Sequence, residues 1–290
     1  MKKVAIFMLF GQSNATGHGV PMEEKDIIST PLKNVFGLNR EPNQSFDTDK
    51  LVFSGYTSFG MNLAETQDNT YSVANCLARL WQDEIDGGAS LPDLYIIQIS
   101  IGSQGVYGMW SPDREKKLIP GALGTVDISL YPFTVHILSL LNKHFKDNEI
   151  EPDFIGIHWR GGEQETWQHT SNLEGRLKND YIRIFNGMRD ALGYECPIVL
   201  HKMPFVDVMK NADPSGKCLD SMNYINALFD ELASELPKTA VFDPFKAPHY
   251  DPNAWDKNLF RWDLIHYNPK TNNWVASEIL NEYKKHYNMI

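Results

Sequence analysis

The chain has 290 residues, a hydrophobic content of 42% and a formal net charge of -10. This composition is typical of a folded protein with a buried core, and the length allows one large domain or two small ones. The acidic balance argues against a nucleic-acid partner, because phosphate binding requires clustered Lys and Arg. A membrane partner is not expected either, since no apolar stretch approaches the roughly 20 residues that cross a bilayer.

Short apolar runs rich in Val, Ile and Phe alternate with longer segments of helical period along the chain. The apolar runs predict five buried strands, at residues 4–10, 94–101, 154–159, 197–203 and 239–243. The periodic segments predict helices at residues 71–85, 128–145, 173–192, 218–236 and 269–287. The last helix has Asn268 as its N-cap and Pro269 at its first position.

The beginning of the chain is interpreted as a strand. Two lysines precede the apolar run at residues 4–10, as in a short secretion signal. However, polar residues follow the run at once, and no small-residue cleavage site is evident. The three cysteines, Cys76, Cys196 and Cys218, are widely spaced and indicate neither a disulfide framework nor a cysteine zinc site.

The alternation of strands and helices predicts an α/β fold with three layers, in which helices cover both faces of a parallel sheet. No repeat, low-complexity tract or linker interrupts the sequence, so residues 1–290 are expected to form one domain. Residues 17–69, 204–217 and 244–268 are too long for simple connections. Functional groups are expected at the carboxyl ends of the strands, where open α/β sheets bind ligands.

The first predicted strand ends in Gly11-Gln12-Ser13-Asn14, a turn that places Ser13 at the start of a helix. Gly11 allows a tight backbone. The free N–H groups of a helix start favour negative charge, so the Ser13 amide is a candidate oxyanion donor. A serine in this position more often serves only as a helix cap, so the motif is weak evidence when taken alone.

Asp263 and His266 stand three residues apart, just before the last predicted helix. This spacing lets the carboxylate reach one ring nitrogen and fix the tautomer, which leaves the other nitrogen to accept a proton from a serine hydroxyl. A polar surface loop would contain the same pair without any catalytic role. Ser13, His266 and Asp263 together are a candidate catalytic triad.

These blocks resemble those of the SGNH hydrolases, and in particular of the sialate O-acetylesterase-like carbohydrate esterases. The first block is residues 11–14 followed by Gly17-His18-Gly19, and the last is Asp263-x-x-His266. The resemblance implies a flavodoxin-like α/β/α sandwich with a central five-stranded parallel sheet. Residues 101–110 are similar to the second block of the family, which implies that Gly102 or Gly105 donates an amide to the oxyanion hole.

Residues 154–165 resemble the third block, usually W-x-Q-G-E-x-D, in which a polar side chain completes the oxyanion hole. Gly161 stands where the family commonly has Gln, and Glu165 where it has Asp. The loss of one oxyanion donor costs on the order of a hundredfold or more in rate. Arg160, Gln164 or a water are the candidate substitutes for the Gln, and Glu163 is interpreted as a brace of this loop.

Aromatic residues are dense around the expected site, and their faces either bind sugars or form ordinary core. They are Tyr107, Trp110, Trp159, Trp167, Trp255, Trp262 and Tyr267. The candidate substrate-binding residues are Gln12, Trp110, Trp159, Arg160 and Glu163. Arg114, Arg160 and Arg261 are candidate partners for a sugar carboxylate. His158, Glu163 and His169 match no standard zinc spacing, so no metal is expected.

The triad and the resemblance predict a serine esterase that removes acetyl groups from carbohydrate without any cofactor. O-acetylated sialic acid and acetylated plant or bacterial glycans are the candidate substrates. One alternative is a carbohydrate-binding or virion structural protein without activity on the same scaffold. Another is a lipid or thioester hydrolase, which the polar and aromatic rim disfavours. The oligomeric state is left open, and the expected location is the cytoplasm or a phage particle, with secretion as an alternative.

Overall fold

The computed structural model describes residues 1–20, 22–65, 68, 70–116, 118–120, 126–168, 174–251, 253, 258–261 and 263–288. Its centre is a seven-stranded sheet with the strand order β3-β2-β4-β1-β7-β8-β9. These strands are β1 (Lys2–Gly11), β2 (Val35–Leu38), β3 (Phe53–Gly55), β4 (Asp93–Ser100), β7 (Ile150–Arg160), β8 (Ile198–His201) and β9 (Thr239–Phe242). A separate two-stranded sheet pairs β5 (Leu118–Pro120) with β6 (Val126–Ile128).

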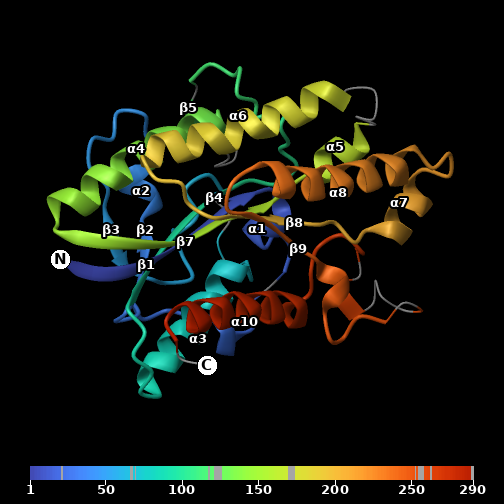
Figure 1. Cartoon of the computed structure of the whole chain (residues 1–290). Helices are drawn as coiled ribbons and strands as arrows, with labels where there is room; N and C mark the ends of the chain where they lie inside the picture. The colour runs from blue at the N-terminus through green and yellow to red at the C-terminus, as the bar shows by residue number, and fades with distance from the viewer. Residues whose placement is uncertain are drawn as a thin grey trace.

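Helices cover both faces of the large sheet (Figure 1). One face carries α4 (Leu130–Asp147), α6 (Glu174–Leu192) and α8 (Lys217–Glu235), and the other carries α3 (Val73–Asp86) and α10 (Pro269–His286). Shorter elements are α1 (Ser13–Thr16), η1 (Glu24–Asp26), α2 (Arg40–Asn43), α5 (Glu163–Trp167), α7 (Val206–Ala212) and η4 (Pro244–Lys246). None of the helices described is both long and apolar enough to cross a membrane.

The three-layer α/β architecture is therefore confirmed, while the organisation as one domain stays a prediction. All five predicted strands are present and run parallel to their neighbours in the sheet. The sheet exceeds the expected five strands because the segment 17–69 adds β2, parallel to β4, and β3, antiparallel to β2. β2 has four residues and β3 has three, which is too short for either to show a strand pattern in the sequence.

The predicted helices are also confirmed, with ends that differ by one or two residues in the described part of the chain. In α10 the side chain of Asn268 accepts a hydrogen bond from the Thr271 amide at 2.8 Å, and Pro269 occupies the first turn. This helix start fixes the position of the residues just before it. Asp263 and His266 belong to that segment.

The position of β1 between two layers of helices explains why its sequence is apolar without interruption. Val4, Ile6, Met8 and Phe10 belong to the core beneath α4, α6 and α8, whereas Ala5, Phe7 and Leu9 belong to the core beneath α3 and α10. All seven side chains are fully buried. A strand covered on both faces has no exposed side that would require polar residues.

A buried pair of histidines lies between neighbouring strands. His158 on β7 and His201 on β8 bring Nδ1 and Nε2 to 3.1 Å from each other, and both side chains are about 95% buried. Burial, with a further contribution from the charge of Arg160, lowers the pKa of His158 to about 3. Burial also places the pKa of His201 well below its ordinary value. Both imidazoles are therefore neutral in the folded protein at neutral pH.

This pair predicts a loss of stability in mild acid. Below a pH of about 6.5 the unfolded chain binds protons at these histidines and the folded chain does not. The free energy of unfolding should therefore fall by about 1.4 kcal/mol per pH unit for each imidazole as the pH is lowered from that value toward 3. Urea titrations between pH 7.5 and 5 would measure this slope. The double variant His158→Leu, His201→Leu should lose most of it, and an unchanged slope in that variant would contradict the assignment.

Candidate active site

Three of the sequence blocks follow strands that are neighbours in the sheet. β1 lies between β4 and β7, and Gly11 at its end pairs with Ser100 on β4 and with Arg160 on β7. The three strands therefore end at the same level, and the blocks after them meet at the carboxyl edge of the sheet. Gly11 has a φ of 138°, and an added Cβ would lie 2.0 Å from the Arg160 carbonyl oxygen. Only glycine allows the backbones to approach so closely here.

A cavity of about 420 Å³ opens at this edge. It is lined by Ser13 of α1, Gly102 after β4, Glu163 of α5 and His266 before α10. The other lining residues are Gln12, His18, Glu65, Ile101, Ser103, Gln164, Trp167 and Ile265. Two hollows of about 360 and 410 Å³ lie elsewhere on the surface, and no Ser or Cys is among their described lining residues. The cavity at the strand ends is thus the place where the predicted nucleophile, Ser13, and the predicted base, His266, lie together.

His266 is held by Asp263 through its ring and its backbone. His266 Nδ1 lies 2.9 Å from Asp263 Oδ2, and Asp263 Oδ1 accepts hydrogen bonds from the amides of His266 at 2.9 Å and Ile265 at 3.1 Å. Partial burial raises the pKa of Asp263, but the hydrogen bonds from the His266 amide, its ring and the Ile265 amide outweigh burial. The pKa of Asp263 therefore lies below its usual value, and the carboxylate remains ionised near neutral pH.

Ser13 is the first residue of α1 and is half-buried at the cavity wall. The prediction that Ser13 stands at the start of a helix is confirmed, although this helix has only four residues. Among the residues that the structure describes, no hydrogen bond joins the Ser13 hydroxyl to the His266 ring. Catalytic hydrogen bonds are commonly long without substrate and tighten when it binds.

The side chain of Asn14 connects the first block to the last. Asn14 Nδ2 donates to the Ile265 carbonyl at 3.2 Å, and Asn14 Oδ1 accepts from the Tyr267 amide at 3.1 Å. These two contacts lie on either side of His266 in the chain. Asn14 therefore fixes the backbone of His266 relative to Ser13, its own neighbour. Asn14 belongs to the first block, but nothing in the sequence indicates this role.

Glu163, the first residue of α5, contacts the same region. Its Oε1 accepts from Asn14 Nδ2 and its Oε2 accepts from Gln12 Nε2, both at 2.9 Å. The side chain is 93% buried, and burial raises the pKa of Glu163. Gln12 also lines the cavity, but its amide is committed to Glu163. Both residues therefore act mainly on the shape of the site.

The two glycines that are candidate oxyanion donors, Gly102 and Gly105, lie in different surroundings. Gly102 lines the cavity, and an added Cβ there would lie 3.8 Å from Ser13 Cβ. Gly105 instead packs against the carboxylate of Glu165, which would lie 2.0 Å from an added Cβ. Glu165 also accepts a hydrogen bond from the Val106 amide, and burial raises the pKa of Glu165 to about 7. Gly102 is thus the glycine beside Ser13, while Gly105 lies against Glu165.

Gly161 lies against the Trp159 side chain. An added Cβ at Gly161 would lie 3.2 Å from the Trp159 ring, and Gly161 does not line the cavity. Of the substitutes weighed for the missing amide, Gln164 lines the cavity. Arg160 does not, because it is 98% buried and its guanidinium stacks 4.6 Å from the centre of the Tyr267 ring.

The expectation that Trp110 and Trp159 contact substrate is wrong. Both side chains are at least 99% buried, with their ring centres 4.9 Å apart, and Trp110 Nε1 donates to the Gly11 carbonyl at 3.1 Å. They belong to the core beneath α4, α6 and α8. Arg160 is excluded from substrate contact by its burial. Among the described lining residues, Trp167 is the one Trp, Tyr or Phe, and the predictions for Trp255, Trp262 and His169 fall outside the described residues.

Within the described part of the chain, no group of three or more His, Cys, Asp or Glu residues is placed to hold a metal ion. Of the three residues weighed for that role, the two that the structure describes have other partners. His158 contacts His201, and Glu163 accepts hydrogen bonds from Gln12 and Asn14.

The fold of this chain also occurs in solved structures of other proteins. No protein-family model matches the sequence, and none of the curated proteins matches it. The structure is similar to that of NanS, with a TM-score of 0.64, 13% sequence identity and 98% of each chain covered. It is also similar to a protein from Arabidopsis thaliana, with a TM-score of 0.56, 11% identity, and coverage of 97% of this chain and 98% of the other. These two similarities show that the chain shares the α/β fold of NanS and of the Arabidopsis protein over nearly its whole length.

Proposed function

We propose that this protein is a serine esterase in which Ser13 is the nucleophile and His266 is its general base. One observation carries the proposal: Ser13 and His266 line the same cavity, and the His266 ring is hydrogen-bonded to Asp263. An ionised Asp263 keeps the proton on His266 Nδ1, which leaves Nε2 free to accept another. The fold supports a hydrolase but leaves the substrate to be argued from the site.

The reaction follows from these positions. Ser13 Oγ attacks the ester carbonyl carbon while His266 takes the hydroxyl proton, and the amides of Ser13 and Gly102 hold the negative oxygen. His266 then gives the proton to the leaving alcohol, which produces an acyl group on Ser13. A water that loses its proton to His266 attacks this acyl group, and the acid leaves as Ser13 regains a proton.

The proposed substrates are acetyl esters of carbohydrates. The resemblance of the four blocks to carbohydrate esterases supports this class. The cavity supports it as well, because Trp167 offers an aromatic face, and His18 and Ser103 are polar groups for sugar hydroxyls.

A screen for acetate release tests the proposed function. The purified protein is mixed with O-acetylated sialic acid, acetylated xylan and p-nitrophenyl acetate, and acetate is measured by a coupled assay. We expect release from p-nitrophenyl acetate and from at least one sugar ester. Release from none of them would reject the esterase.

The same screen separates a second candidate, a carbohydrate-binding protein without activity. Gly161 favours this candidate, because it provides no side-chain amide where the related esterases commonly have Gln. Binding of acetylated sugars without acetate release, measured by calorimetry, would support it.

Gln164 is proposed to supply the missing amide, which gives a further prediction. The variant Gln164→Ala should lower kcat for p-nitrophenyl acetate by about 10- to 100-fold with little change in KM, because an oxyanion donor acts in the transition state. Gln168→Ala is the matched control, since Gln168 is exposed just after α5 and does not line the cavity. Equal kcat values for the two variants would remove Gln164 from the oxyanion hole.

A further inference from the structure

Arg160, the last residue of β7, is a buried cation behind the candidate active site. Its side chain is 98% buried. Arg160 Nη1 donates to the Asn14 carbonyl at 3.0 Å and to Asn272 Oδ1 at 3.2 Å, and the guanidinium stacks on the Tyr267 ring. Because a buried charge is stable only where it is hydrogen-bonded, these contacts hold the guanidinium in one place.

The contacts of Arg160 lie on both sides of Ser13 in the chain. The Gln12 amide donates to the Arg160 carbonyl at 2.9 Å, while the Arg160 side chain binds the Asn14 carbonyl. Both neighbours of the proposed nucleophile are therefore bonded to this one residue.

The same side chain also contacts the segment that carries His266. Tyr267, on whose ring the guanidinium stacks, follows His266 directly. Asn272 lies in the first turn of α10, and its Nδ2 donates to the Tyr71 carbonyl at 2.9 Å. The proposed nucleophile and base come from distant parts of the chain, and Arg160 contacts residues next to each.

Glu163 provides a charge of opposite sign on the other side of Asn14. The Glu163 carboxylate accepts from Asn14 Nδ2, whereas Arg160 binds the carbonyl of the same residue. Burial raises the pKa of Glu163, and the charge of Arg160 opposes this rise. Burial lowers the pKa of Arg160, and the charge of Glu163 opposes this fall. Asn14 is thus bonded to two buried groups, each of which favours the charged form of the other.

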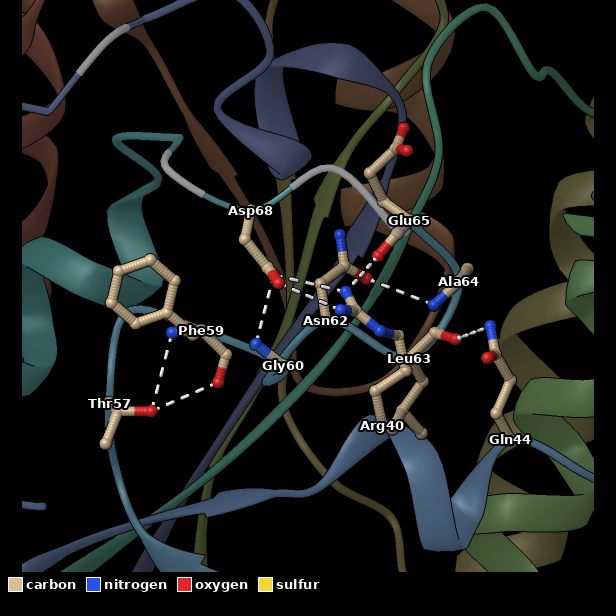
Figure 2. A network of polar contacts seen from close by, with 10 residues as sticks. All are labelled: Arg40, Gln44, Thr57, Phe59, Gly60, Asn62, Leu63, Ala64, Glu65 and Asp68. Carbon is tan, nitrogen blue, oxygen red and sulfur yellow. Dashed lines mark hydrogen bonds and ion pairs between the residues drawn. The ribbon is translucent and has the colours of Figure 1, made fainter. Parts of the chain in front are cut away.

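The wall of the cavity at Glu65 is held by other contacts (Figure 2). Arg40 forms a two-pronged ion pair with Asp68, at 3.1 and 2.9 Å, and also donates to the Glu65 carbonyl at 2.6 Å. These contacts involve neither the nucleophile nor the base, so a change at Arg160 should leave this wall in place.

We propose that Arg160 is a positioning residue, whose guanidinium sets the distance between Ser13 and His266 through the neighbours of both. The inference rests on the proposed function. A displacement of about 1 Å between reacting groups costs about a hundredfold in rate, so the effect belongs to kcat. A lysine would keep the charge and a donor, but its ammonium group lacks the planar face that stacks on Tyr267.

The test compares Arg160→Met with Arg189→Met. Arg189 is the matched control, because it is a second buried arginine, 94% buried, that donates to backbone carbonyls. Its partners are the carbonyls of Cys196 and Pro237, which precede β8 and β9 at the opposite end of the sheet from the cavity. Both variants remove a buried guanidinium and keep an unbranched apolar side chain of similar reach.

Hydrogen exchange, followed by mass spectrometry, is the first readout because it needs no activity. In Arg160→Met we expect the amides of residues 12–17 and 264–268 to exchange about tenfold faster or more, in both segments together. Arg189→Met should leave both segments within about twofold of the native rates. Native exchange in Arg160→Met, faster exchange in only one segment, or an equal change in Arg189→Met would overturn the inference. This result stands even if the acetate screen rejects the esterase.

The second readout is turnover of p-nitrophenyl acetate at a temperature where the variants are folded. Arg160→Met should lower kcat by about 10- to 100-fold with KM within about threefold of native, and Arg189→Met should keep the native kcat. Arg160→Lys should lower kcat by about 3- to 10-fold, and it replaces Arg160→Met in both measurements if that variant does not fold. A native kcat in either Arg160 variant, or a change confined to KM, would overturn the inference.

Discussion

Replacing Ser13 with Ala should lower kcat for p-nitrophenyl acetate by about 10⁴- to 10⁶-fold, because the alanine lacks the oxygen that carries the acyl group. The fold should be unaffected, since the Ser13 hydroxyl makes no hydrogen bond among the described residues. Initial rates of p-nitrophenol release at saturating ester measure the loss. Thermal unfolding of both proteins checks that the variant is folded.

Ser139→Ala is the matched control for this variant. Ser139 is exposed on α4, and its hydroxyl donates to the His136 carbonyl at 2.7 Å, away from the cavity. The control should retain the native rate. Turnover by Ser13→Ala within tenfold of the native rate would remove Ser13 from the mechanism.

Replacing Asp263 with Asn should lower kcat by about 10³- to 10⁴-fold at neutral pH. The asparagine oxygen is still able to accept the amides of Ile265 and His266, so the turn should persist. Its NH₂ group, however, would donate to His266 Nδ1 where the carboxylate now accepts. The proton of the neutral ring would then lie on Nε2, which would no longer be able to accept the proton of Ser13.

The measurement for Asp263→Asn is a rate profile between pH 6 and 9. Loss of activity with an unchanged melting temperature would separate the tautomer effect from a collapse of the turn. A rate close to that of the native protein over the whole range would show that Asp263 does not orient the base.

The long strands and the large helices were predictable because burial determines which of their residues are apolar. A strand covered on both faces gives a continuous apolar run, and a helix that packs on the sheet gives an apolar residue every three or four positions. β1 is an example, since its uninterrupted apolar run matches a strand enclosed between two helical layers. β2 and β3 were missed for the opposite reason. They are four and three residues long at one edge of the sheet. Their identity as strands depends on the pairing of β2 with β4 and of β3 with β2 rather than on a local pattern.

The site was predictable where residues lie at strand ends, and less so where it depends on distant packing. Ser13 and His266 follow from the blocks, and the structure places both at one cavity. Glu65 carried no signal, because its loop reaches the cavity only through contacts of Arg40, Gln44 and Asn62. The sequence also does not reveal which aromatic side chains point inward, so Trp110 could not be assigned to the core.

Covalent labelling with a fluorophosphonate, mapped by peptide mass spectrometry, tests most directly whether Ser13 is an activated nucleophile. The account predicts one label per chain, located on Ser13, and a much slower reaction in His266→Ala because the hydroxyl then has no base. Ser103 is an internal comparison, since it also lines the cavity and is exposed. A label on Ser103 with none on Ser13, or equal labelling rates with and without His266, would contradict the account.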